Sequence, residues 1–443
     1  MAEATIYALA TPAPSRAAPG AIAVLRLSGP RAGDALSLLT GRPLPAPRRM
    51  VVRSLLDPTS GEEIDRGLVV WFEAPNTETG ETMAELHSHG GRAVVGGLLD
   101  ALANLGFCRL AQPGEFTRRA FENGKLDLTE AEGIADLVAA ETGQQRRQAL
   151  AQMEGALHRL YEAWRAQGLR ALAHLEAAID FPDEDLPAGI DARVTEEISD
   201  LARQIDAHLQ DRRGERLRDG LSIAILGPPN AGKSSLLNLL ARREAAIVSE
   251  TAGTTRDVIE VHLDLGGWPV VLADTAGLRP SSDPVEREGV RRAMKRAEQA
   301  DLRLLVVAAD DDWRARAAEL EQSAGAGLVV VNKIDLLSSA DVPADYAAVS
   351  TLSGAGVPAL LARIEAKVAD AFDASGPPPL TRARHREALL DARNALARAL
   401  DAPEVALAAE DVRLAMRAIG RITGTVRIDE LLDVIFRDFC IGK

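Results

Sequence analysis

The chain has 443 residues, of which 47% are hydrophobic and 3% aromatic, and its formal net charge at pH 7 is −14. This length and composition predict roughly two to four folded domains and exclude a disordered chain. The acidic balance argues against a simple nonspecific nucleic-acid binder. Two cysteines, Cys108 and Cys440, are too few for a disulfide framework and favour a reducing, cytoplasmic location. We find neither an apolar run of about 18 residues nor a signal peptide, so we expect no membrane span.

Residues 1–120 predict a mixed α/β domain. Short apolar runs broken by Pro or Gly are typical of strands, and two longer stretches have helical spacing. The expected strands cover 6–12, 21–29, 50–57, 66–75 and 80–91, and the expected helices cover 31–41 and 93–107.

Residues 121–215 and 373–443 both predict mostly helical structure. Thr129 is expected to cap the first of these helices, with Glu132 completing a capping box. Helical sequence thus flanks residues 216–372 on both sides. Because insertions succeed where chain ends lie close together, we predict one helical domain that is interrupted by an inserted domain.

The inserted region opens with the sequence LSIAILGPPNAGKS at 221–234. An apolar strand ends at Gly227, and the pattern G-x-x-x-x-G-K-S closes at Ser234 before a helix. The glycines and the helix N-terminus would present backbone N–H groups to phosphate oxygens. Lys233 would reach the β- and γ-phosphates, and Ser234 would ligate Mg²⁺. We therefore expect a P-loop nucleotide-binding domain with alternating strands and helices.

The motifs that follow predict a GTPase. Asp274 ends an apolar strand and begins D-T-A-G, where its carboxylate would hold Mg²⁺ through water. A threonine of the loop 249–257, Thr254 or Thr255, would complete the Mg²⁺ shell, and we assign this role to Thr255. In N-K-x-D, Asp335 would accept two hydrogen bonds from guanine that adenine cannot supply, while Asn332 would brace the loop.

The last base-contacting loop is expected at Ser350, Thr351 and Leu352, although its sequence departs from the usual S-A-K/R pattern. The full set of residues expected to contact the nucleotide is Asn230, Ala231, Gly232, Lys233, Ser234, Ser235, Ser249, Glu250, Thr251, Ala252, Gly253, Thr254, Thr255, Asp274, Thr275, Ala276, Gly277, Asn332, Lys333, Asp335, Ser350, Thr351 and Leu352.

With these residues placed, the chain resembles the TrmE-type (MnmE) GTPases that modify tRNA, within the Era-like group. The resemblance covers essentially the whole chain and rests on GPPNAGKSSLLN, TAGTTRD, DTAGLR, NKID, ELHSHGG, FENGKLDLTEAE and the terminal FCIGK. It implies an α+β multidomain protein with an N-terminal folate-binding domain at 1–120, a helical domain at 121–215 and 373–443, and an inserted Ras-like GTPase domain at 216–372.

The resemblance also implies a homodimer that works with the flavoprotein MnmG (GidA) in a heterotetramer or larger complex. Together they would add an aminomethyl or carboxymethylaminomethyl group to the 5-position of the wobble uridine of tRNA. The carbon would come from 5-formyl- or methylene-tetrahydrofolate, and the folate contacts would be Arg26, Glu85, Lys125 and Lys443. From the residues alone, Arg26 and Glu85 are equally consistent with an ordinary pair of surface charges.

Three catalytic residues are carried over from the resemblance: Lys233, Glu286 and Cys440. Leu278 replaces the glutamine that usually positions water, and Glu286 matches the family's proposed general acid/base residue. Glu288 is its neighbouring competitor, and a surface or capping role for either stays open. Cys440 would lie in an apolar helix, either as inert packing or as a thiol that lines a site. A K⁺ ion bound by Asn230, Ser249, Thr251 and Thr254 would take the place of an arginine finger.

Two other interpretations compete with a GTPase of tRNA modification. A ribosome-assembly GTPase of the Era or Der kind would carry a KH-type tail or a second GTPase domain, and neither follows residue 370. A membrane-associated switch would need an anchor or a basic amphipathic helix, and we find neither.

Overall fold

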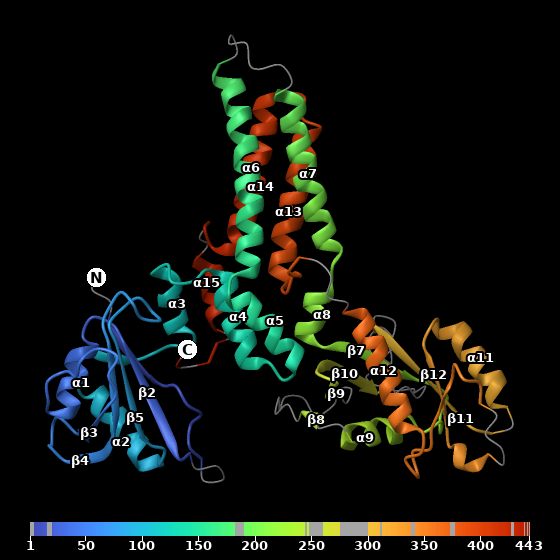
Figure 1. Cartoon of the computed structure of the whole chain (residues 1–443), viewed down its shortest axis with the longest axis horizontal. Coiled ribbons are helices and arrows are strands. Elements are labelled where there is room, and N and C mark those ends of the chain that lie inside the picture. The colour runs from blue at the N-terminus through green and yellow to red at the C-terminus, as the bar shows by residue number, and fades with distance from the viewer. Residues whose placement is uncertain are drawn as a thin grey trace, which may run out of the picture. The chain divides into compact units, whose positions relative to one another are not determined.

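The computed structural model describes residues 4–15, 20–181, 190–243, 246–247, 260–274, 300–310, 312–337, 342–372, 377–426, 429–437, 439–440 and 442. The chain divides into two compact units. The first combines Met1–Ala135 with Ile419–Lys443, and the second is Asp136–Ala418 (Figure 1).

The first unit is built on a sheet whose described strands run in the order β3-β4-β5-β2-β1-β6. Strand β6 is parallel to β1, and the other neighbours are antiparallel. The strands are β1 Thr5–Leu9, β2 Ile22–Ser28, β3 Val51–Leu56, β4 Glu63–Phe72, β5 Met83–His89 and β6 Cys108–Leu110.

One face of this sheet is covered by helices α1 (Ala32–Thr40) and α2 (Arg92–Ala103). Leu25 and Leu27 of β2 are fully buried in the same apolar cluster as the helix leucines. Because side chains alternate along a strand, Arg26 lies on the opposite face. Alternation therefore separates a packed face from a face that carries charge.

The C-terminal residues complete the first unit. Helix α15 (Asp429–Arg437) packs against α3 (Glu115–Glu122) and the start of α4 (Leu128–Ala139). The rings of Phe121 and Phe436 lie 6.3 Å apart. Aromatic packing thus holds together segments that are more than 300 residues apart in sequence. Burial of the large apolar rings stabilises this contact.

The capping box predicted at Thr129 and Glu132 is wrong by two residues. Asp127 precedes α4, and its Oδ1 accepts from the N–H of Glu130 at 2.8 Å. The Glu130 carboxylate in turn accepts from the N–H of Asp127 at 2.8 Å. Thr129 is buried and donates its hydroxyl to Asp127. Aspartate is as good an N-cap as threonine, and here it stands one residue before the helix, where the geometry of a cap requires it.

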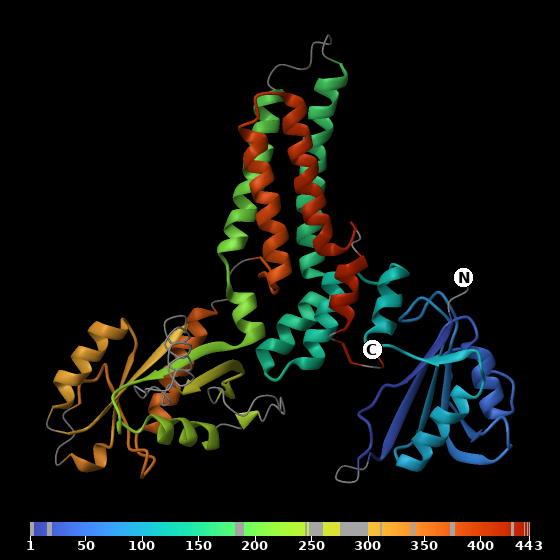
Figure 2. The same cartoon turned by 180° about the vertical axis from the view of Figure 1, so that it is seen from behind.

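The second unit contains a helical bundle built from both sides of the inserted region. Figures 1 and 2 show α6, α7, α13 and α14 side by side, and α7 contacts both α6 and α13. The continuous helical stretch expected after residue 129 is divided into α4, α5 and α6, with Gly155 in the left-handed region at the start of α6. The helices of this helical part are α5 Gly143–Met153, α6 Ala156–Asp180, α7 Ile190–Gln210, α8 Arg213–Asp219, α13 Ala383–Leu400 and α14 Val405–Thr423, the last of which continues from residue 419 into the first unit.

An aromatic cluster with two histidines fills the bundle core. Tyr161 and Trp164 of α6 contact His208 of α7, and Tyr161 also contacts His385 of α13. The Tyr161 hydroxyl lies 3.3 Å from Nε2 of His208, which is 3% exposed. The pKa of His208 is lowered to about 4, mainly by burial, with smaller contributions from His385 and Arg386 and against the opposing effect of Asp211. His208 is therefore neutral in the folded protein at pH 7.

The bundle is expected to lose stability as pH falls because of His208. In the unfolded chain this histidine gains its proton near pH 6.5, whereas in the folded chain its pKa is about 4. The unfolded state thus binds more protons between these values, and moving from pH 7 to pH 5 should cost about 2 kcal/mol. Hydrogen exchange of the α6 and α7 amides at the two pH values measures this loss.

His208→Gln, which cannot titrate, should reduce the loss of stability between pH 7 and pH 5. His174→Gln, on the exposed side of α6, should leave that loss unchanged. An unchanged loss in His208→Gln would contradict the assignment.

The second unit also contains a mostly parallel sheet, whose described strands run in the order β13-β12-β11-β7-β10-β9-β8. Strands β8, β9 and β10 form an antiparallel edge, in which the two-residue β8 is the outermost strand and pairs with β9. The strands are β7 Leu221–Leu226, β8 Ala246–Ile247, β9 Glu260–Leu265, β10 Trp268–Asp274, β11 Leu302–Ala308, β12 Leu328–Asn332 and β13 Ala347–Ala348.

Helices cover both faces of this sheet. Buried leucines of α9 (Lys233–Arg243) and α12 (Val357–Ala371) share one cluster with Leu304 and Val306. Helix α11 (Trp313–Ala324) packs on the other face, against alternate residues of β11 and β12. The predicted fold class is confirmed: an α/β N-terminal part, a helical part and an inserted P-loop α/β part. None of the helices in the described part of the chain combines the length and hydropathy needed to span a bilayer.

Candidate GTP-binding site

The phosphate loop joins the central strand β7 to helix α9. Strand β7 lies between β10 and β11, both parallel to it, so the loop emerges at the carboxyl edge of the sheet. A Cβ atom on Gly227 would collide with the carbonyl oxygen of Val306, and one on Gly232, whose φ is +92°, would collide with the Asn332 amide. Both positions therefore require glycine. Because glycine has no Cβ atom, the backbone of the loop can approach a phosphate closely.

The Lys233 side chain folds back over this loop. Its Nζ donates to the carbonyl oxygens of Gly227 at 2.9 Å and Pro228 at 3.0 Å. Ser234 and Ser235 follow in the first turn of α9 and are exposed. A cation and a helix N-terminus thus face the same space, which is the arrangement that favours a bound polyphosphate.

Asn332 connects the three parts of the site. It ends β12 and is completely buried. Its Nδ2 donates to the carbonyl oxygen of Ala231 at 2.8 Å, and its Oδ1 accepts from the N–H of Thr351 at 3.1 Å. The side chain thereby joins the phosphate loop to the loop that starts at Ser350, so the bracing expected of Asn332 is present in the geometry.

The residues beside Asn332 include the predicted base acceptor, Asp335. Asp335 is the partner of the Ser350 hydroxyl, which donates to Oδ1. Lys333 has a φ of +63°, and its Nζ donates to the carbonyl oxygen of Asn230 at 2.7 Å. Leu352 is 86% exposed, so its side chain points to solvent. The links made by Lys333 and Ser350 were not predicted, because no local pattern encodes contacts between residues so distant in sequence.

Several predicted site residues lie outside the described residues. Asp274 is the last residue of β10, and only its backbone is described. The predictions that lie outside entirely concern Ser249, Glu250, Thr251, Ala252, Gly253, Thr254, Thr255, Thr275, Ala276, Gly277, Leu278, Glu286, Glu288 and Lys443.

The predicted folate residues Arg26 and Glu85 are direct partners across the sheet of the first unit. They face each other in the register of β2 and β5, and the Arg26 Nε lies 3.2 Å from the Glu85 Oε1. Arg26 also pairs with Glu78 at 2.7 Å, and Oε2 of Glu85 lies 3.3 Å from the His87 Nε2. Glu78 and His87 were not singled out as members of this group. The spacing of Glu85 and His87 by two residues was the available signal, because it places both on one face of a strand.

Lys125 lies next to the turn that precedes β5. A Cβ atom on Gly80 would be 3.2 Å from the Cε of Lys125, whose side chain is exposed. Glu78, the partner of Arg26, belongs to the same turn. The structure therefore brings Lys125 close to the Arg26 and Glu85 group.

The expectation for Cys440 needs correction. Helix α15 ends at Arg437, so Cys440 lies beyond it and is exposed rather than packed in an apolar helix. Its carbonyl oxygen accepts from the N–H of Gly114 at 3.3 Å. Cys108, in contrast, is core, and burial raises the pKa of its thiol to about 11. Of the two thiols, Cys440 is thus the accessible one.

Two protein-family models match this chain. The model described as the MnmE helical domain matches residues 128–440, and the one described as the GTP-binding protein TrmE N-terminus matches residues 5–125. The first match starts in α4 and ends three residues beyond α15, so it includes the helices on both sides of the P-loop region.

Curated relatives match along nearly the full length. A tRNA modification GTPase MnmE from Parvibaculum lavamentivorans is 57% identical over 99% of this chain and 100% of its own. Proteins of the same name from Rhodospirillum rubrum and Paramagnetospirillum magneticum are 55% and 56% identical, over 99% of this chain and 100% and 99% of theirs. With its P-loop, its N-K-x-D acceptor and these matches, the chain belongs to the family of tRNA modification GTPases called MnmE.

Proposed function

We propose that this GTP hydrolase is activated by K⁺ and works with the flavoprotein MnmG (GidA) on the 5-position of the tRNA wobble uridine. A tetrahydrofolate derivative would supply the one-carbon unit for the aminomethyl or carboxymethylaminomethyl group. One observation supports this proposal above the others: a single chain contains two separate sites. In the first, Asn332 links the phosphate loop to the loop that starts at Ser350, and in the second, Arg26 and Glu85 form an ion pair on a different sheet.

The loop between β7 and α9 would bind the phosphates. Lys233 would exchange its two carbonyl partners for phosphate oxygens, and the N–H groups at the start of α9 would add further donors. The hydroxyl of Ser234 is exposed at this helix start, where it fits a Mg²⁺ ligand, with Thr255 and Asp274 as the proposed remaining contributors. A Mg²⁺ ion held there would neutralise charge on the phosphates.

Water activation is proposed for Glu286. An apolar residue, Leu278, occupies the position from which a glutamine would orient the attacking water. A carboxylate can accept the proton of that water, through a bridging water where it does not reach directly. Lys233 would stabilise charge as it develops on the transferred phosphoryl group, as preorganised donors do in such sites.

Asn230 fits the role of a K⁺ ligand. Its φ is +64°, and its own carbonyl oxygen already accepts from Lys333, while the residue itself is exposed at the loop. The side-chain amide oxygen remains available for a cation beside the phosphates. Ser249, Thr251 and Thr254 are the proposed further ligands. A monovalent cation there would supply the positive charge that an arginine finger provides in other GTPases.

The Arg26 and Glu85 group fits a folate. A carboxylate can accept paired hydrogen bonds from a pterin ring, and the guanidinium of Arg26 holds that of Glu85 in a defined orientation. Lys125 and the terminal Lys443 would attract the acidic tail of the cofactor. Cys440, accessible beyond α15, is the proposed additional thiol of the modification site.

The coupling between hydrolysis and the helical part would pass through the β9–β10 hairpin. The backbone N–H of Gln144, at the start of α5, donates to the carbonyl oxygen of Gly267 in this hairpin at 3.1 Å. Strand β9 follows the loop 249–257 in the sequence, and β10 ends at Asp274, the first residue of D-T-A-G, so both predicted nucleotide-sensing segments adjoin the hairpin. We propose that hydrolysis moves the helices through this contact, rather than supplying the carbon chemistry itself.

Nucleoside analysis of tRNA tests the proposal. In cells that lack this protein, we expect wobble uridines without the 5-substituent, restored by the wild-type gene but not by Arg26→Ala, which removes the partner of Glu85. Arg66→Ala, an exposed arginine on β4, should restore modification fully. Normal wobble uridines together with defective ribosomal subunits would instead support an assembly GTPase of the Era or Der kind.

A further inference from the structure

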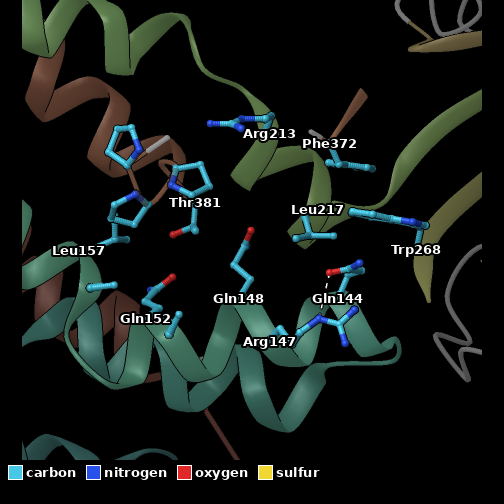
Figure 3. A pocket seen from close by; sticks show the side chains of 15 residues that line it. Gln144, Arg147, Gln148, Gln152, Leu157, Arg213, Leu217, Trp268, Phe372 and Thr381 are labelled. Atoms are coloured by element: carbon cyan, nitrogen blue, oxygen red, sulfur yellow. Dashed lines mark hydrogen bonds between the residues drawn. The ribbon is translucent and has the colours of Figure 1, made fainter. Parts of the chain in front are cut away.

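A second cavity, of about 390 Å³, lies within the second unit, away from the nucleotide site. Its walls come from α5, α6 and α8 on one side and from β10, the end of α12 and the proline-rich segment on the other (Figure 3). None of its lining residues belongs to the phosphate loop or to N-K-x-D. Small-molecule sites commonly have this size and occur where helical and sheet regions of a protein meet.

Most of the wall is apolar. Leu157 and Leu217 line it, together with the stacked rings of Trp268 and Phe372, whose centroids are 4.9 Å apart and nearly parallel. Among the described residues of the wall no carboxylate occurs, and Arg147 lies exposed at one side. The cavity therefore favours a flat apolar molecule that is neutral or negatively charged, over a cation.

Six polar side chains interrupt the apolar wall: those of Gln144, Arg147, Gln148, Gln152, Arg213 and Thr381. The Thr381 side chain is 2% exposed, and within the described part of the chain its hydroxyl has no hydrogen-bond partner. The Oε1 atom of Gln148 is buried and likewise lacks a partner there, whereas its Nε2 donates to the carbonyl oxygen of Gly214 at 3.1 Å. That bond fixes which end of the Gln148 amide faces the cavity. Figure 3 shows the Gln148 oxygen directed into the open space, while the Thr381 oxygen points to the side where Gln152 lies.

A buried polar atom without a hydrogen-bond partner destabilises the folded protein by about 1–3 kcal/mol, so two such atoms in the lining of one cavity indicate a partner. Gln148 presents an acceptor and requires an N–H or O–H donor. The Thr381 hydroxyl can donate to a carbonyl oxygen. An N–H beside a carbonyl, as in a lactam, satisfies both at once.

We propose that this cavity binds a flat, mostly apolar, uncharged or anionic small molecule through a lactam edge. The lactam N–H donates to Oε1 of Gln148, its carbonyl oxygen accepts from the hydroxyl of Thr381, and its ring system packs between the leucines and the Trp268–Phe372 pair. This inference does not depend on the proposed roles of K⁺, folate or the flavoprotein.

Titration of the full-length protein with 2-quinolone tests the site. Calorimetry should detect binding, and N-methyl-2-quinolone, which lacks the donor, should bind about 3- to 10-fold more weakly. Thr381→Val keeps the side-chain shape and removes the hydroxyl, so it should weaken the binding of 2-quinolone by a similar factor. In Gln148→Met the two compounds should bind equally, because the acceptor that distinguishes them is gone.

Matched variants exclude indirect effects. Thr195→Val makes the same chemical change on the exposed surface of α7 and should leave binding unchanged. Ala156→Trp fills the cavity and should abolish binding, and GTP turnover should persist in each variant because the nucleotide site is elsewhere. No binding of 2-quinolone to the wild type, or equal binding of the two quinolones to it, overturns the proposal. The comparison of the two quinolones uses only the wild-type protein, so it remains valid even if a substitution impairs folding.

Discussion

Replacement of Asp335 by asparagine should change the nucleotide preference from GTP to XTP. The Asp335 carboxylate accepts two hydrogen bonds from guanine in the proposed complex. An amide offers one acceptor and one donor, which matches the N–H and carbonyl edge of xanthine. Two hydrogen bonds to a charged acceptor are worth about 3–6 kcal/mol, so GTP affinity should fall roughly 10²- to 10⁴-fold. Ser350, which donates to Oδ1, can keep the same bond to the asparagine oxygen.

Equilibrium binding of fluorescent GDP and XDP, followed by turnover of GTP and XTP, measures this change. Asp345→Asn is the matched control, because Asp345 is an exposed aspartate of the same α/β region and lies outside N-K-x-D. It should leave the preference for GTP intact. If Asp335→Asn binds GTP like the wild type and gains no affinity for XTP, Asp335 does not read the base.

GTP turnover should be at least about 100-fold faster in K⁺ than in Na⁺ at matched ionic strength. The estimate follows from the cost of removing one preorganised positive or hydrogen-bonding group from a developing charge. Asn230→Gly should remove most of the difference, since glycine adopts the φ of +64° without strain but lacks the amide oxygen. Turnover of this variant in Na⁺ should stay close to that of the wild type.

Steady-state phosphate release in the two salts measures the effect. Arg48→Gly provides the control for backbone freedom, because Arg48 also has a positive φ, of 62°, and lies in the first unit. It should respond to K⁺ like the wild type. Equal turnover in K⁺ and Na⁺ for the wild-type protein would discard the cation site, while leaving the assignment of Asp335 untouched.

The fold class and the phosphate loop could be predicted because their signals are local. Apolar periodicity of two or three to four residues reports which face of an element is buried, and it predicted β1 to β5 of the first sheet within a few residues of their observed bounds, whereas the short β6 was not predicted. The glycines of the loop are required by contacts made at their own positions, as the collision at Gly227 illustrates. Helix starts were harder to predict, because Asp127 and Thr129 are both good caps and only the backbone path selects between them.

The residue pattern alone shows a P-loop followed by N-K-x-D, and it therefore predicts a nucleotide site with a carboxylate for the base. How these parts are joined depends on the packing of the folded chain. Asn332 spans from Ala231 to Thr351, Glu78 and His87 gather beside Arg26 and Glu85, and Cys440 lies exposed beyond its helix. These contacts connect residues that are distant in sequence, so they arise from the packing of whole elements, which no short pattern of residues encodes.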